Sequence, residues 1–478
     1  MDTYHDVRRA RAVALIAAAV WACPHSARGA PSSDLLESPP GLELNVPPTA
    51  CGEPLNRKAL SLSEVVRAVM CDSPKVRQAA TEVAQEKGNV GVAEARYYPT
   101  LSSTVATNRI GKEVGYPDAS YANYSLHAYS GNVDIGLSWL LFDSGKRGAN
   151  LDKAKALWRA SVYALALTNR EQVIAVAAEY YRARTAAAGA RAAEEASVRA
   201  EQNFRATARL LSVGVGAVTD ELLAKGAWQR SQAESEDRKR SARIATATLA
   251  TKIGVSAGED LQLVSEQWHW SDARNPTPEL RKLDALLSMA MLKNPRLSAA
   301  RQRTLAAKAE VGILAAEIKP SISLHANRYL SLTPPADSMA KQEIRGWSVG
   351  LQLRIPLFDG FSTRHATQSA QARTHAAALE ERNVQLEEEL KTLTDYENVL
   401  SGERKVSLLL EALESSKAAY KGAEARYKQG VGTLIELLKA QEELAKVTQD
   451  SIQAHYELLA AKFRIAIALD KTPMRSDF

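Results

Sequence analysis

The residue types that build catalytic and metal sites are present in this 478-residue sequence, but their spacing fits none of those chemistries. The eight histidines are scattered, and even His365 and His375 are ten positions apart, with no HExxH motif. The sequence also has no P-loop and no GxGxxG motif, so nothing in it indicates nucleotide binding. We therefore expect no enzymatic activity, no metal and no cofactor, and energy for any work must come from a partner.

The three cysteines could take part in chemistry of two kinds. Cys51 and Cys71 could form a disulfide across a loop of 20 residues in an oxidising compartment, or could stay as free thiols. Cys23 follows Val-Trp-Ala in a stretch that faintly resembles a lipoprotein cleavage box, although tryptophan fits that box poorly. Lipidation of Cys23 is therefore an alternative to plain signal cleavage.

Signal cleavage is expected because residues 1–30 have the composition of a secretory signal peptide. Arg8, Arg9 and Arg11 form a charged start, and the apolar stretch 12–22 is too short to span a bilayer as an ordinary helix. No later run reaches 18 apolar residues, so we expect no helical membrane span in the mature chain.

The elements that follow are set by an internal duplication. Pro74 and Pro99 are 25 residues apart, as are Pro295 and Pro320, and the second pair lies 221 positions after the first. Further motifs recur 216 positions apart, namely Leu-Phe-Asp at 141–143 and 357–359 and Gly-Val-Gly at 214–216 and 430–432. A repeat of this length outweighs any local motif in predicting the fold. The sequence therefore predicts two copies of one unit.

The repeat also sets the expected domain boundaries. A proline-rich, extended segment at 31–59 precedes the first repeat. The expected order after it is a first repeat at 60–255, a linker at 256–282, a second repeat at 283–470 and a C-terminal tail at 471–478.

Each copy contains a segment in which apolar and polar residues alternate with a period of two. In the second copy this pattern runs for 11 residues from Trp347 to Leu357, which is long enough to cross a membrane as a tilted β-strand. A weaker strand precedes each one, and the alternative is a half-buried sheet in a soluble domain. The predicted strands lie near 100–110, 132–141, 321–330 and 346–357.

Very long helices follow both hairpins. The stretches 146–212 and 361–428 contain no break for more than 60 residues, which corresponds to roughly 100 Å of helix. Heptad spacing, as in Val399, Val406 and Leu413, is typical of helices that pack along a coiled-coil seam. Shorter helices are expected at 61–96, 218–254 and 434–469.

The four predicted strands cannot close a barrel, because single-chain barrels begin at about eight strands. An open sheet edge in lipid leaves backbone groups unsatisfied, at several kcal/mol each. Two chains would give eight strands whose side chains fill the interior, and three would give twelve and leave a passage. The expected fold is therefore mainly α-helical, with a membrane β-barrel portion shared between chains.

The repeated order of helix, proline, hairpin, Leu-Phe-Asp-Gly-like turn and long helix resembles the TolC family of outer-membrane efflux and secretion channels. So do Gly-Val-Gly-Ala-Val-Thr-Asp at 214–220 and Gly-Val-Gly-Thr-Leu-Ile-Glu at 430–436. The resemblance covers about 60–470, and within the family it is greatest to the members that secrete the adenylate cyclase toxin cyclolysin. It implies a homotrimer whose helical barrel extends from the periplasm into a shared 12-stranded β-barrel in the outer membrane of a Gram-negative bacterium.

The same resemblance implies the partners. These are a periplasmic adaptor (membrane fusion) protein, an inner-membrane exporter driven by ATP or protons, an exported substrate and outer-membrane lipid. Nucleic acid is not expected, because the net charge of +6 is mild and is interleaved along helical stretches.

Family members close their periplasmic tip through polar links between helices, and carboxylates ring the entrance. Asp220 and Tyr427 match positions of the closing network, whereas Gly432 stands where the family has arginine. Glu436 matches the first entrance carboxylate, and Lys439 stands at the second. Alternatively, Asp220 and Glu436 only stabilise helix starts, and Tyr427 packs in the heptad.

Two further sets of residues complete the expected sites. One set is the glycines of the helix turns, Gly214, Gly216, Gly430 and Gly432. The other marks the membrane boundary, where strands meet helices, and consists of Pro99, Phe142, Pro320 and Phe358.

The leading functional interpretation is the outer-membrane channel of a type I secretion system, a passive conduit for an exported protein toxin. The first alternative is the outer-membrane component of a multidrug efflux pump. The further alternatives are a periplasmic adaptor and a structural coiled-coil protein. An adaptor would add β-domains with many short strands, and the period-two segments argue against a purely structural coiled coil.

Overall fold

The computed structural model describes the greater part of both repeats. The described residues are 60–115, 117–118, 124–259, 261–264, 283–333 and 342–469. The expected signal peptide and proline-rich segment, with Cys23 and Cys51, lie outside them. Most of the linker and the C-terminal tail do as well.

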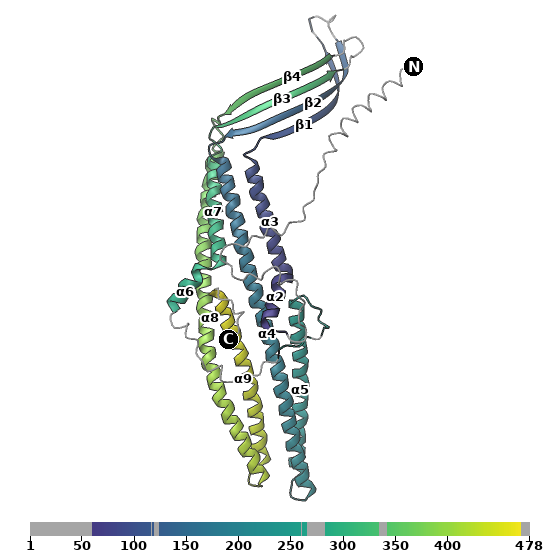
Figure 1. Cartoon of the computed structure of the whole chain (residues 1–478), viewed down its shortest axis with the longest axis vertical. Helices are drawn as coiled ribbons and strands as arrows, with labels where there is room; N and C mark the ends of the chain where they lie inside the picture. Colours follow the sequence, from purple (N-terminus) through teal and green to yellow (C-terminus); the bar gives the residue numbers. More distant parts are fainter. Residues whose placement is uncertain are drawn as a thin grey trace, which may run out of the picture. The chain divides into compact units, whose positions relative to one another are not determined.

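The two copies have the same order of elements, which confirms the predicted duplicated fold (Figure 1). Helices α4 and α8 each have 67 residues, and α5 and α9 each have 35. The first copy comprises α2 (Leu62–Asp72), α3 (Pro74–Ala95), β1 (Thr100–Val114), β2 (Tyr124–Phe142), α4 (Lys146–Ser212) and α5 (Val218–Lys252). The second comprises α6 (Leu283–Leu292), α7 (Pro295–Ala315), β3 (Ser321–Thr333), β4 (Gln342–Arg354), α8 (Ser362–Lys428) and α9 (Leu434–Ala468).

The helix expected over 61–96 is in fact two helices, so that prediction was wrong. Ser61 and Glu64 form a capping box at the start of α2, and the helix ends at Asp72. Pro74 then occupies the first position of α3. Proline is favoured there because its missing N–H would have no partner in the first turn, whereas inside a helix its ring clashes with the preceding turn.

The strand boundaries also differ from the prediction. Strands β1 and β2 extend further toward their hairpin than 100–110 and 132–141, and β3 continues to Thr333. Strand β4 spans Gln342–Arg354 instead of 346–357. Pro356 follows shortly after its end and cannot donate a ladder hydrogen bond.

The four strands form one antiparallel sheet in the order β1-β2-β3-β4, so the pairing of β2 with β3 joins the two copies (Figure 1). One face carries polar side chains, where Ser331 donates to the Oδ1 atom of Asn132 at 2.7 Å. On this face the ring of Tyr329 covers Gly346, whose position has no room for a Cβ atom. The other face is apolar, and Trp347 on it is 77% exposed within the single chain.

Helix α4 is the central element of the helical part, because it packs against α3, α5, α7 and α9. The main core cluster lies around α2 and includes Val65, Val173, Leu249 and Phe463. Leu60 pairs with Leu263 in a parallel bridge beside this cluster, so part of the expected linker belongs to the core.

Helix α8 uses its heptad row as the sequence pattern predicts. Val399, Val406 and Leu413 are buried, and Tyr420 and Tyr427 continue the row. By contrast, Leu379 and Leu386 are about half exposed, so that part of α8 has an apolar face that the single chain leaves uncovered.

The contact between α4 and α9 leads to a test of stability against pH. Burial, together with the charges of Lys462 and Arg184, lowers the pKa of His455 on α9 to about 3. In the unfolded chain the ordinary value is about 6.5, so the unfolded state binds the extra proton below that pH. The contribution of neutral His455 to the free energy of unfolding is therefore fully present above about pH 6.5. As the pH falls from about 6 to about 3, this contribution decreases by about 1.4 kcal/mol per pH unit.

We expect the detergent-solubilised protein to lose less thermal stability between pH 7 and pH 5 when His455 is replaced by glutamine. His365→Gln, which removes an exposed histidine of α8, is the matched control. Equal pH dependence of the wild type and the His455→Gln variant would contradict the expectation.

Candidate functional site

The first turn of the candidate entrance joins α4 to α5. Helix α4 ends at Ser212, and Gly214 is left-handed, with a φ of 80°. The N–H of Gly214 donates to the carbonyl oxygen of Leu211 at 2.9 Å, and that of Val215 donates to Leu210 at 3.1 Å. This pair of bonds is a Schellman motif, which satisfies the last carbonyl groups of a helix and favours glycine at its left-handed position.

The second turn, between α8 and α9, has the same hydrogen bonds. Gly430 is left-handed, with a φ of 75°. Its N–H donates to the carbonyl oxygen of Tyr427 at 3.0 Å, and that of Val431 donates to Arg426 at 3.0 Å. The duplicated Gly-Val-Gly motif therefore encodes the same helix end twice.

Gly432, which stands where the resembled family has arginine, is held closely by this turn. A Cβ atom at Gly432 would lie 3.0 Å from Cβ of Arg426 and 3.1 Å from the backbone nitrogen of Tyr427. At Gly216 the corresponding contact, with the backbone nitrogen of Leu211, would be 2.8 Å. A side chain at Gly432 would therefore shift the turn.

Tyr427 lies in the interface between the two copies. Its hydroxyl contacts the Oγ1 atom of Thr207 on α4 at 3.4 Å, and both side chains are buried. The structure thus joins Tyr427 to Thr207, whereas the resemblance grouped it with Asp220. In the same interface the amide nitrogen of Asn203 donates to Oε1 of Gln441 on α9 at 2.6 Å.

These contacts form a buried polar seam between α4 and the pair α8 and α9. Burial raises the pKa of Tyr420, which also interacts with Asn203. Further along, the side-chain nitrogen of Gln449 donates to the carbonyl oxygen of Gly189 at 2.9 Å. Spacing alone did not single out Asn203, Thr207 or Gln441, because each resembles an ordinary polar residue of a helix surface.

The charged candidates lie at the starts of the short helices. Asp220 is in the first turn of α5, and Glu436 is in the first turn of α9. The N–H of Glu436 donates to Oγ1 of Thr433 at 3.3 Å, so Thr433 caps this helix. Glu436 and Lys439 are exposed and three positions apart, which places them on one helix face.

The same turns also expose apolar side chains. These exposed residues are Val213, Val215, Val218 and Leu222 in the first copy and Val431 and Ile435 in the second.

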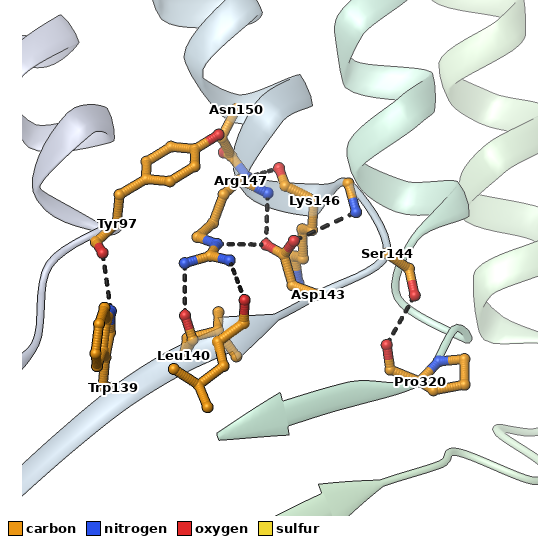
Figure 2. A network of polar contacts seen from close by, with 11 residues as sticks. Tyr97, Trp139, Leu140, Asp143, Ser144, Lys146, Arg147, Asn150 and Pro320 are labelled. Carbon is orange, nitrogen blue, oxygen red and sulfur yellow. Dashed lines mark hydrogen bonds and ion pairs between the residues drawn. The ribbon is translucent and has the colours of Figure 1, made fainter. Parts of the chain in front are cut away.

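The other candidate site is the junction between the sheet and the helices, where the membrane boundary is expected. Asp143 follows β2, and its Oδ2 atom accepts from the backbone N–H of Arg147 at 2.6 Å (Figure 2). The Nε atom of Arg147 lies 3.2 Å from the same oxygen; the Asp143 side chain is buried, and that of Arg147 is 12% exposed. The motif therefore places a largely buried ion pair at the start of α4.

Arg147 also holds the end of strand β2 (Figure 2). Its Nη1 and Nη2 atoms donate to the carbonyl oxygens of Leu140 at 2.5 Å and Leu141 at 3.0 Å. Its Cζ atom lies 4.8 Å from the centre of the Tyr97 ring, within range of a cation–π contact. Trp139 Nε1 donates to the carbonyl oxygen of Tyr97 at 2.9 Å. One guanidinium group thus connects the turn after α3 with β2 and α4.

The neighbouring Ser144 connects the two copies at this junction. Its hydroxyl donates to the carbonyl oxygen of Pro320 at 2.7 Å, immediately before β3 (Figure 2). Lys146 and Glu317 form an exposed ion pair at 3.2 Å beside it. Pro320 was predicted from the sequence and Arg147 was not, although the position of Arg147 four residues after the Asp of Leu-Phe-Asp was a usable signal.

The junction of the second copy lacks the arginine. Asp359 accepts from the backbone N–H of Thr363, which takes the place of Arg147, at 2.8 Å. The rings of Phe358 and Phe361 meet edge to face, with 5.3 Å between their centres. Phe142 and Phe358 are both more than half exposed in the single chain, and their place at the membrane boundary stays a prediction.

Three observations concern the other candidate chemistry. Cys71 is disulfide-bonded, and its pairing with Cys51 stays a prediction because Cys51 lies outside the described residues. The described residues contain no group of three or more His, Cys, Asp or Glu side chains placed to hold a metal. Among the helices of the described part, none is long and apolar enough to span a membrane.

The sequence match to a protein family decides the identity. The family model for outer membrane efflux protein matches residues 65–255 and 286–469, one match per copy. The chain belongs to the outer membrane efflux protein family. It is therefore a TolC-like channel protein of the outer membrane.

Individual relatives agree with this family. Protein CyaE of Bordetella pertussis is 28% identical over 97% of this chain and 94% of its own length. The alkaline protease secretion protein AprF of Pseudomonas aeruginosa is 25% identical over 55% of this chain and 54% of its own. The solved structure of the outer-membrane channel OprN superimposes with a TM-score of 0.71 at 20% identity, covering 86% of this chain and 90% of that one.

The junction of this family member yields a prediction about Arg147. Replacing Arg147 by methionine would leave the buried Asp143 carboxylate without its cation, which costs about 3–5 kcal/mol when such a pair is broken. We expect a clear loss of thermal stability in the purified channel. Lys146→Met, which breaks an exposed pair, should cost less than about 1 kcal/mol.

Adding Asp143→Asn to Arg147→Met should recover part of the loss, because the unpaired charge is then gone. If Arg147→Met destabilises the channel no more than Lys146→Met, the Asp143–Arg147 pair does not hold the junction.

Proposed function

We propose that this chain is the outer-membrane channel of a type I secretion system, giving an exported protein a passive conduit across the periplasm and outer membrane. The observation that carries the proposal is the likeness along nearly the whole chain to protein CyaE of Bordetella pertussis, which agrees with the resemblance of the repeated motifs to the family members that secrete cyclolysin. The likeness to AprF, a secretion protein for alkaline protease, points the same way. The exported substrate of this chain is a protein in this proposal.

The working unit in this proposal is a homotrimer. One chain contributes four strands, and β1 and β4 are the edges of its sheet. Three chains would supply twelve strands, enough for a closed barrel that leaves a passage. The uncovered apolar face of α8 around Leu379 and Leu386 would then pack against a neighbouring chain.

The energy for export comes from partners in this proposal. They are a periplasmic adaptor and an inner-membrane exporter, because the sequence has no nucleotide-binding motif of its own. The exposed apolar side chains of the two helix turns, such as Val215 and Val431, offer the adaptor a surface at the entrance.

The entrance itself would be held closed by the polar seam. Opening requires α8 and α9 to shift against α4, and this shift would separate Tyr427 from Thr207 and Gln441 from Asn203. Each buried polar group left without a partner costs about 1–3 kcal/mol. The seam therefore favours the closed state until a partner offsets this cost.

A multidrug efflux pump is the second candidate function, because the family as a whole is described by efflux. Deleting the gene separates the two functions. We expect a large protein to disappear from the culture medium while sensitivity to drugs and dyes stays unchanged, and expression of the full chain should restore its secretion. Increased drug sensitivity with an unchanged set of secreted proteins would favour the pump.

The entrance charges yield a prediction about ion selectivity. Glu436 and Lys439 are exposed neighbours on α9, so their opposite charges partly cancel in the field of the entrance. Lys439→Asp should make the channel more cation-selective, as measured by reversal potentials across planar bilayers under a salt gradient. Lys446→Asp, one heptad further from the turn, should change selectivity less. Unchanged selectivity of the Lys439→Asp channel would exclude this residue from the entrance ring.

A further inference from the structure

The strand pairing determines which side chains share the outward face of the sheet. Leu351 pairs with Leu324, Leu324 with Trp139, and Ile135 with Ser103, so these positions all lie on one face. On β4 the outward row is Trp347, Val349, Leu351 and Leu353, with Ile355 and Leu357 continuing the alternation beyond the strand. Lipid-facing residues of a membrane barrel are apolar, so this face is the one that contacts lipid.

Three arginines interrupt this apolar face. Arg328 on β3 pairs with Trp347, Arg345 on β4 pairs with Leu330, and Arg109 on β1 is the next outward position after Thr107. All three side chains are exposed. They therefore occupy positions in the apolar phase of the alternation, where a soluble-domain sheet would bury its core.

Arg109 and Arg345 lie in the hairpin-side halves of β1 and β4, and Arg328 lies near the middle of β3. The hairpins are at the ends of the strands away from the helices (Figure 1). Because the helices of this family extend into the periplasm, the hairpin ends lie on the outer side of the membrane. The row from Trp347 to Leu357 contains 11 residues, and its ten steps give about 24 Å of height at a tilt of about 45°. An outer-membrane barrel has an apolar band about 25 Å tall, so Trp347 marks its outer edge.

The tilt of the strands brings two of the arginines to that edge. The apolar row of β1, Leu101 to Val105, is centred at the register of Trp347, whereas the row of β4 is centred near Leu351 and Leu353. The apolar band therefore crosses the sheet obliquely, as it must when tilted strands share a barrel. Arg109 and Arg345 follow the outer border of this oblique band, whereas Arg328 lies inside it, with Leu330 and Leu332 further out on the same strand.

Energetics favour the same position. An arginine on the lipid face is strongly disfavoured at the bilayer midplane and is tolerated near the interface. Acidic groups on this face lie further out, at Glu343 on β4 and Glu113 on β1. Glu343 accepts from the Nε atom of Arg345 at 2.6 Å, so one carboxylate competes for this guanidinium.

We propose that Arg109, Arg328 and Arg345 form a binding site for the phosphate groups of phosphorylated glycolipids in the outer leaflet, of the lipid A type. A planar guanidinium group binds phosphate through two parallel hydrogen bonds, and the apolar rows below it offer a surface for acyl chains. Headgroup and chains are thus both matched by one face of the sheet. The inference rests on the proposed shared barrel, in which each chain contributes one such set.

The test uses the full-length channel purified in detergent, with fluorescent lipid A as the probe. Combining Arg109→Gln, Arg328→Gln and Arg345→Gln should weaken binding about ten-fold or more, since each lost charge-assisted contact contributes to affinity. Arg354→Gln is the matched control, because Arg354 is an exposed arginine of β4 on the opposite, polar face. It should leave lipid A affinity unchanged.

Two further arms separate the outcomes. Glu343→Gln should tighten binding of lipid A about two- to three-fold by releasing Arg345. Lipid A that lacks its phosphates should bind the wild-type channel as weakly as ordinary lipid A binds the triple variant. Single-channel conductance in planar bilayers reports whether each variant still forms the channel, independently of lipid binding. If the triple variant does not assemble, Arg328→Gln alone should still weaken binding measurably. Equal binding by wild type and arginine variants, or equal weakening by Arg354→Gln, would overturn the proposal.

Discussion

The unpaired backbone groups of the two edge strands limit the assemblies that this protein can form in a membrane. Strands β1 and β4 form the edges of the sheet, and each leaves a row of N–H and C=O groups that no other strand of the described sheet satisfies. In water such groups bond to solvent, but in lipid each costs several kcal/mol. The apolar outward rows place the sheet in lipid, so these groups must pair with another chain. The requirement for several chains therefore follows from hydrogen bonding, before any family is considered.

The duplication is an economical way to meet this requirement. Each copy supplies one hairpin and one pair of long and short helices, and the pairing of β2 with β3 joins the copies in the sheet. The contact of α4 with α9 joins them again in the helical part. The copies differ where their surroundings differ. Arg147 holds the end of β2, an interior strand, whereas Thr363 takes its place after β4, an edge strand.

Much of the fold could be predicted from the sequence because two periodicities are long and clean. The alternation from Trp347 to Leu357 and the unbroken helical pattern of α4 and α8 need no tertiary information. Helix and strand ends were harder, because capping and sheet edges decide them. Ser61 and Pro74, for example, divide one predicted helix into two.

The sites were less predictable than the fold, since they depend on contacts between distant residues. The bond between Asn203 and Gln441 joins positions 238 residues apart, and no local pattern marks either one. Gly432 shows a limit of inference from family likeness. Likeness to a family suggested a missing arginine, whereas the turn geometry gives a steric reason for glycine at this position. Arg328 could have been noticed, because it stands in the apolar phase of its strand.

Cross-linking of the two sheet edges between chains tests the central claim most directly. One cysteine placed on the polar face of β4, at Ser348, would be combined in turn with cysteines along the same face of β1, from Ser102 to Ala106. Oxidation in isolated outer membranes should join chains at one register, and denaturing gels should show a ladder that ends at three chains. Absence of any cross-link between chains, or a ladder that ends at two or continues past three, would contradict the shared twelve-stranded barrel.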